Sequence, residues 1–208
     1  MKRGFILIKK FFSLLTCAVL SASLFCGCGD ESGSSNEYYY GQALKEVDGK
    51  DIYLIYDGRY VTDDEMDVLT NYYSSIQRKD YELFKTTQPG PYVDFLEKKQ
   101  SKEVSSYVDD FYKEVEDGVG GDFDFTQIEV TDCGTSREDS GINDIKELLD
   151  GIYEDAGMEK SFSDTVNDAK YIVFNLSAES KDGETFNLSD EMKYIFTCED
   201  GTYIPVSY

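Results

Sequence analysis

The sequence predicts an α+β domain in which N-terminal helices pack on a curved antiparallel sheet, preceded by an N-terminal signal segment. Three observations support this prediction. Residues 1–27 join basic residues to a short apolar run, apolar residues recur at helical spacing through 63–115, and residues 171–208 alternate in strand-like runs. The chain has 208 residues, of which 40% are hydrophobic, so it can bury the core of one domain.

The first 27 residues have the charge pattern of an export signal. Lys2, Arg3, Lys9 and Lys10 stand there without any acidic residue, whereas the remaining chain holds 16 basic and 42 acidic residues, a net charge of −26. Residues 11–25 (FFSLLTCAVLSASLF) are almost entirely apolar. This run is shorter than the ~20 residues of a permanent bilayer-spanning helix, and its length is typical of a signal peptide.

The sequence Cys26-Gly27-Cys28 follows the apolar run and resembles the lipobox of bacterial lipoproteins. The resemblance implies a signal peptide over 1–27, cleavage between Gly27 and Cys28, and attachment of diacylglycerol to Cys28. Cys26 is the alternative, although bulky Phe25 would then precede the cleaved bond. The family prefers Leu where this chain has Phe25. Cleavage without lipid and an uncleaved anchor stay open as alternatives.

Lipidation implies a lipid-bilayer partner, reached through diacylglyceryl-Cys, and a place on the outer face of the cell membrane in a Gram-positive-type envelope. Residues 28–50 are expected to be a flexible polar tether, because residues 30–37 (DESGSSNE) are rich in Ser and acidic residues. Residues 51–208 are expected to form a single domain.

The predicted elements begin with a hairpin over 51–61 that turns at Asp57-Gly58. A capping box from Thr62 to Glu65 predicts a helix over 63–78. Further helices are expected over 80–86, 92–99, 104–118 and 142–152. Strands are expected over 123–133, with a bulge between Phe125 and Ile128, and over 171–180, 185–198 and 202–208, the second of these last three being interrupted near Ser189-Asp190.

Residues 72–84 (YYSSIQRKDYELF) resemble the opening motif YY-x-A-I-x-x-x-D-Y-x-x-F of cystatin-like, or nuclear-transport-factor-two-like, domains. Residues 200–203 (DGTY) resemble the closing D-G-x-W/Y strand of the same family. The likeness covers about 62–208 and implies a cone of helices against a curved sheet, to which the 51–61 hairpin is an addition. The fold hosts enzymes, binding modules and scaffolds, and no enzymatic residue of the family maps onto this chain.

Composition argues against several functions. A net charge of −22 disfavours nucleic acid as a partner and binding to anionic lipid through a basic patch. The chain has no His, the usual general base and the commonest metal ligand. The best start of a calcium loop, at Asp122, has Gln127 and Cys133 where Gly and Glu are required. We therefore predict no catalytic residue, no metal site and no cofactor.

Cys133 and Cys198 are the two cysteines left in the body after lipidation of Cys28. An exported protein can join them in a disulfide, which would stabilise the fold by about 4 kcal/mol in the chain-entropy model. Two separate buried thiols are the alternative.

The sequence thus predicts a membrane-anchored extracytoplasmic lipoprotein that acts as a binding or interaction module for an unknown envelope protein or small ligand. The alternative is a small-molecule isomerase or hydro-lyase that uses carboxylate and Tyr groups. An enclosed pocket with a desolvated carboxylate beside a Tyr would indicate the enzyme. A filled interior and an exposed apolar patch would indicate the docking module.

Overall fold

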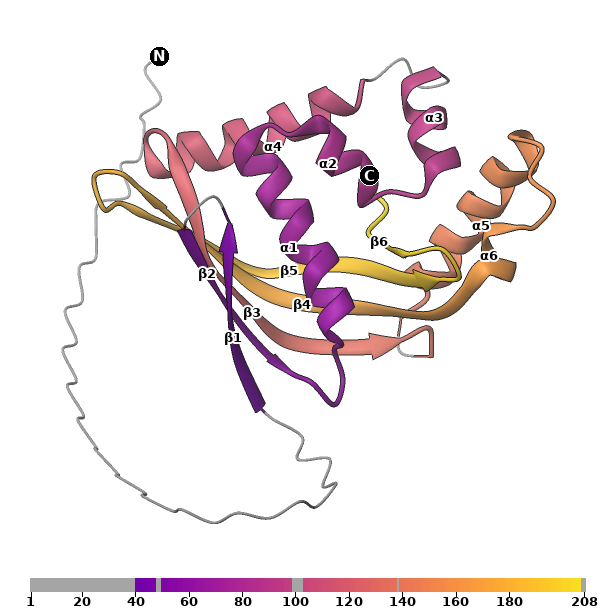
Figure 1. Ribbon diagram of the computed structural model, residues 1–208, viewed down its shortest axis with the longest axis horizontal. Helices are drawn as coiled ribbons and strands as arrows, with labels where there is room; N and C mark the ends of the chain where they lie inside the picture. Colours follow the sequence, from indigo (N-terminus) through magenta and orange to yellow (C-terminus); the bar gives the residue numbers. More distant parts are fainter. Residues whose placement is uncertain (1–39, 48–49, 99–102, 138, 207–208) are drawn as a thin grey trace, which may run out of the picture. The chain divides into compact units, whose positions relative to one another are not determined.

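The computed structural model describes residues 40–47, 50–98, 103–137 and 139–206, with side chains from Ile52 onward. All of these residues belong to one compact unit, residues 37–208. In the described residues the fold is mixed α/β, with six helices and one mixed sheet whose strand order is β1-β2-β3-β4-β5-β6 (Figure 1).

The helices follow the predicted apolar spacing closely. The sequence correctly predicts α1 and its capping box: Thr62 Oγ1 accepts the Glu65 amide at 3.3 Å, and Glu65 Oε2 accepts the Thr62 amide at 2.8 Å. A short helix after Ser161 was not predicted, because one turn leaves no periodic pattern. The helices are α1 Asp63–Arg78, α2 Tyr81–Thr86, α3 Gly90–Lys98, α4 Val104–Val119, α5 Gly141–Asp155 and α6 Phe162–Thr165.

The strands are β1 Tyr40–Val47, β2 Lys50–Asp57, β3 Phe123–Thr135, β4 Val166–Ser180, β5 Thr185–Cys198 and β6 Thr202–Tyr203. Neighbouring strands are antiparallel except β2 and β3, which pair in parallel. The prediction of an antiparallel sheet is therefore wrong at this pair. The chain between β2 and β3 passes through four helices, and such a long connection returns it to the sheet in the same direction.

The predicted 51–61 hairpin is also wrong, because β2 pairs with β1. The amides of Tyr60 and Val61 donate to Asp57 O at 2.9 and 3.1 Å, which closes a turn where the second strand was expected. Val61 then enters the core, where it is 1% exposed. Residues 40–47, placed by the prediction in a flexible tether over 28–50, form β1 instead. Val47, the last residue of β1, pairs with Lys50, the first residue of β2.

Irregularities in the sheet agree with the pattern of the sequence. The register of β3 against β4 shifts between Phe125 and Gln127, which confirms the predicted bulge. A second shift lies between Val130 and Asp132. The expected interruption of β5 is confirmed at Asp190, whose φ of 58° is left-handed.

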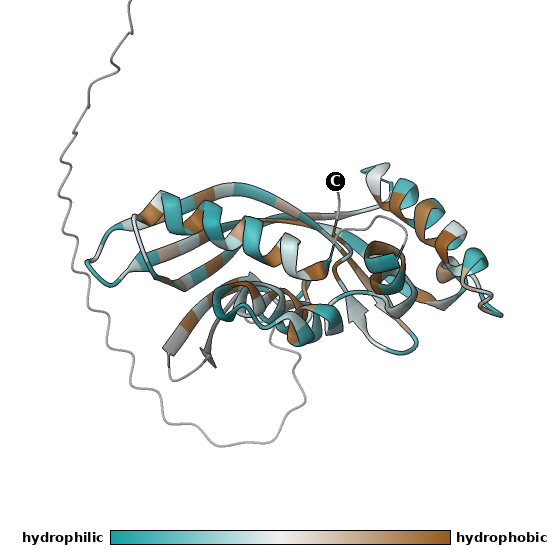
Figure 2. Ribbon diagram, turned by 90° about the horizontal axis from the view of Figure 1, so that it is seen from above, coloured by the Kyte–Doolittle hydropathy of each residue, from teal (hydrophilic) through white to brown (hydrophobic). Residues whose placement is uncertain are grey.

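The core has two clusters on opposite faces of the sheet. Ile195 belongs to the cluster beneath α1 and α4, whereas its neighbour Phe196 belongs to the cluster formed with α3, α5 and α6. Successive strand side chains point to opposite faces, so β5 serves both clusters. Apolar and polar residues alternate along the helices in Figure 2, as this amphipathic packing requires.

Candidate functional site

The most distinctive surface feature is the place where β2 leaves β3. Their pairing covers only Tyr53–Ile55 with Gln127–Glu129, whereas β3 continues to Thr135 while paired with β4 (Figure 1). Of the residues that the structure describes, none pairs as a strand with the other side of Val130–Thr135. We call this side of Val130–Thr135 the open edge of β3.

A hollow of about 320 Å³ lies along the open edge, lined by Asp57, Tyr60, Val61, Val130, Thr131, Asp132 and Cys133. Val61 and Val130 give it apolar walls. Tyr60 stands at its rim with 58% of its surface exposed, and the Arg59 guanidinium lies 5.3 Å from the centre of its ring. Arg59 is itself held by Asp57, whose Oδ1 accepts the Arg59 Nε–H at 2.9 Å.

A buried ion pair lies next to this hollow. Lys170 Nζ, on β4, is 2.9 Å from Glu65 Oε1 on α1 and donates to Tyr60 O at 2.9 Å. Burial opposes the charge of Lys170, but the hydrogen bond and charge of Glu65 outweigh it and raise the pKa of the ammonium. Burial raises the pKa of the Cys133 thiol as well, although Lys170 opposes that shift. Cys133 is therefore a weakly ionised thiol beside a cation that is already paired.

The interior between α1 and the sheet holds a second polar group. Lys193 and Glu191 pair with Ile172 and Phe174 on β4 and so share their core-facing side. Lys193 Nζ lies 5.5 Å from the centre of the Tyr72 ring, and burial lowers its pKa against the opposing charge of Glu191. Burial also raises the pKa of both Tyr72 and Tyr73.

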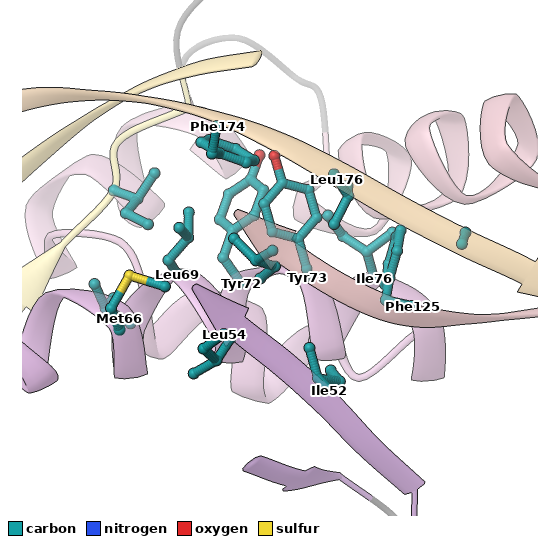
Figure 3. Close-up of a cluster of buried hydrophobic side chains, with 14 of the residues drawn as sticks. Ile52, Leu54, Met66, Leu69, Tyr72, Tyr73, Ile76, Phe125, Phe174 and Leu176 are labelled. Atoms are coloured by element: carbon teal, nitrogen blue, oxygen red, sulfur yellow. The ribbon is translucent and has the colours of Figure 1, made fainter. Parts of the chain in front are cut away.

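Aromatic and aliphatic side chains fill this interior. Figure 3 shows the Tyr72 and Tyr73 hydroxyls side by side, directed toward β4. The Tyr73 ring lies 5.5 Å from Phe125 and 5.7 Å from Phe174, and all three side chains are at most 1% exposed. Tyr73 Oη has no hydrogen-bond partner among the described residues. The helix–sheet interface is thus a packed core at this point.

The structure separates the two cysteines of the body, and both are free thiols. Cys133 lies opposite Ile172 and Cys198 opposite Val166, so the two positions are two strands apart and six residues apart along β4. Six strand residues span about 20 Å, whereas a disulfide needs Cα atoms about 4.4–6.8 Å apart. Of the two possibilities left open by the sequence, a Cys133–Cys198 disulfide and two separate thiols, this structure has the second.

The other predicted site residues, Cys26, Gly27 and Cys28, lie outside the described residues. Across the described ranges, no helix is long and apolar enough to cross a membrane. In the same ranges, no three Asp, Glu or Cys side chains are grouped as metal ligands would be.

Lys170 and Lys193 are site residues that the sequence reasoning missed. The sequence indicates both positions, because residues two apart on a strand face the same side of the sheet. Lys170 is therefore on the side of the buried Ile172 and Phe174, and Lys193 is on the side of the buried Ile195. A lysine in the core-facing register of a strand requires a partner or a functional reason.

Comparisons with protein-family models, with curated proteins and with solved structures find no match for this chain.

Proposed function

We propose that the chain is a membrane-anchored extracytoplasmic lipoprotein whose body is a binding or interaction module of the cystatin-like kind. The packed interior around Tyr73 is the main support for a binding module. Side chains fill the space that enzymes of such a fold use as a cavity. The hollow at the open edge of β3, with exposed Tyr60, offers a surface for docking instead. The order of helices, strand, helix and antiparallel strands supports the cystatin-like part.

The N-terminal sequence carries the proposal for the anchor. Two or more acyl chains on Cys28 would hold the body stably at the bilayer, whereas one chain gives only marginal binding. Labelling of expressing cells with radioactive palmitate tests this. The wild-type chain is expected to take up label and Cys28→Ser to lose it. Label that persists in Cys28→Ser would place the anchor at Cys26, and a wild-type chain without label would refute lipidation.

The binding role is tested by affinity capture. The full chain, solubilised in detergent, is immobilised and exposed to envelope extract, and captured proteins and small molecules are identified by mass spectrometry. A partner that binds the folded chain, and not the urea-unfolded chain, supports the module. Failure to enrich any partner over the unfolded control in extracts from several growth conditions counts against it.

The interior group of Lys193, Glu191 and Tyr72 favours a second candidate, an isomerase or hydro-lyase. A lysine with a lowered pKa beside a phenol and a carboxylate is suited to proton transfer. A panel of small keto acids and enones, screened for proton exchange in deuterated water, tests it. Exchange by the wild-type chain that Lys193→Met abolishes would support the enzyme, and equal exchange by both chains would refute it.

A further inference from the structure

Among the described residues, β3 has no strand partner along its open edge. The Cys133 amide already donates to Asp132 Oδ1 at 2.9 Å, and Thr135 O accepts the Asp139 amide at 3.2 Å, so an added strand exchanges these two local bonds for bonds of its own. Gly134 follows without a side chain, and a Cβ added there would lie 2.6 Å from the Tyr171 ring, so this ring covers one face of the strand. An incoming extended chain therefore meets a strand that β4 supports and that has no side chain of its own at Gly134, where the Tyr171 ring covers one face.

The hollow beside this edge suits a long basic side chain. Its more exposed apolar wall, Val130, can contact the aliphatic stem of Lys or Arg, which leaves the charged head in water. Asp57 and Asp132 line the same hollow, and Asp57 is already bound to Arg59. Among the described residues Asp132 has no cationic partner.

The charges around the open edge favour a cationic partner over a second copy of this chain. The carboxylates of Asp57, Glu65, Asp132 and Asp168 outnumber the cations of Arg59 and Lys170, and each cation is already in an ion pair. A second copy of this chain would bring the same acidic edge and a body of the same strongly negative charge. Like charges placed opposite each other across paired strands are destabilising, so a cationic partner fits better.

We propose that the open edge of β3 binds an extended basic segment of a partner protein by strand addition. Backbone hydrogen bonds to Val130–Thr135 provide the affinity, and alternate Lys or Arg side chains enter the hollow toward Asp57 and Asp132. This inference rests on the proposed function as an interaction module and names the class of partner for it.

A synthetic probe tests strand addition directly. The probe is a fluorescent seven-residue peptide that alternates Lys with Val, and its binding to the full chain in detergent is followed by anisotropy. A second peptide of the same sequence has N-methyl groups on alternate amides, which removes backbone donors and keeps the charge. We expect the methylated peptide and a Glu-Val peptide each to bind at least about tenfold more weakly. Equal binding of the methylated peptide, or no binding of the first peptide, overturns the proposal.

The position at which the Lys-Val peptide binds is tested in two ways. Hydrogen exchange should slow at the amides of residues 130–135 when the Lys-Val peptide binds, and protection confined to other residues would overturn the proposal. Asp132→Lys should weaken binding by about tenfold, because the charge lines the hollow. Asp182→Lys is the matched control, since Asp182 lies in the exposed turn between β4 and β5, at the far end of the sheet. Equal affinities of the two variants would place the peptide elsewhere.

Affinity capture separates this inference from the proposed function. If the wild-type chain captures a protein from envelope extract and Asp132→Lys loses it, while Asp182→Lys keeps it, both proposals are supported. If all three chains capture the protein equally, the interaction module stands and the open edge is refuted as its site.

Discussion

Lys170 Nζ and Glu65 Oε1 lie 2.9 Å apart in an ion pair whose side chains are 12% and 2% exposed. The pair joins the start of β4 to the first turn of α1. Glu65 also completes the capping box through the Thr62 amide, so one carboxylate closes the helix and holds the lysine. Lys170 in turn fixes the turn before α1 through Tyr60 O. The wall of the hollow formed by Tyr60 and Val61 therefore depends on this pair.

Replacing Lys170 with Met should destabilise the protein strongly. The substitution leaves Glu65 as a buried carboxylate without its counter-charge, which typically costs about 3–5 kcal/mol. The free energy of unfolding, from urea denaturation, measures the loss. Lys170→Met with Glu65→Leu should recover much of it, since the unpaired charge is then gone.

The exposed pair of Lys160 and Glu199 is the matched control for Lys170. Lys160 Nζ and Glu199 Oε2 lie 2.6 Å apart with side chains 57% and 54% exposed, so water screens the pair and Lys160→Met should cost far less stability than Lys170→Met. If Lys170→Met lowered the free energy of unfolding no more than Lys160→Met does, water would be screening the Lys170–Glu65 pair as well.

The two cysteines should react as separate thiols. Without reducing agent, alkylation of the urea-unfolded chain should modify both Cys133 and Cys198, and mass spectrometry counts the adducts. In the folded chain Cys133 should react first, because it is half-buried whereas Cys198 is 6% exposed. Peptides that stay unmodified until reduction would show instead that the thiols pair. Cys133→Ser provides the control that identifies the slow thiol.

Local patterns account for what the sequence predicts correctly. The capping box from Thr62 to Glu65 depends on four adjacent residues, so it marks the start of α1 without tertiary information. The bulge after Phe125 is visible as a change of parity within one strand. In the same way, the αL residue at Asp190 interrupts a single alternating run.

Pairing between strands that are distant in the chain accounts for the features of the fold that the sequence does not predict. Tyr40–Val47 becomes a strand because β2 lies beside it, and its own composition resembles the polar tether before it. The parallel pairing of Leu54 with Ile128 joins positions on either side of four helices. The site at the open edge arises from this pairing and from its early end, so the pattern of any one segment could not reveal it.

Tyr73→Phe should leave stability unchanged or raise it by about 1 kcal/mol. The Tyr73 hydroxyl is buried without a partner among the described residues, and a buried polar group without a hydrogen bond costs about 1–3 kcal/mol. Tyr92→Phe is the matched control, because the Tyr92 hydroxyl donates to Val206 O at 2.5 Å and its removal should destabilise by about 1 kcal/mol. Urea denaturation gives the free energy of unfolding of both variants. If the two variants lost the same amount of stability, a bound water or ligand would be forming a hydrogen bond with the Tyr73 hydroxyl.

The free energy of unfolding should fall steeply above pH 10, and ionisation of Tyr56 should account for part of this decrease. Burial, together with the 2.7 Å hydrogen bond to Asp63, raises the pKa of Tyr56 from 10 to about 12. The folded state therefore keeps a proton that the unfolded state releases, so the contribution of Tyr56 is complete below pH 10 and is lost as pH rises to 12. Tyr153, whose pKa burial also raises to about 12, acts in the same direction.

The urea midpoint measured between pH 9 and 12 tests this, with tyrosinate absorbance recorded in parallel. Tyr56→Phe should be less stable than the wild type at pH 9, because it lacks the bond to Asp63, and the difference should shrink toward pH 12 as the wild type loses its own advantage. Tyr53→Phe, at an exposed position on the same strand, should follow the wild-type curve throughout. A constant difference between Tyr56→Phe and the wild type from pH 9 to 12 would show that the Tyr56 phenol has the same pKa in the folded and unfolded states.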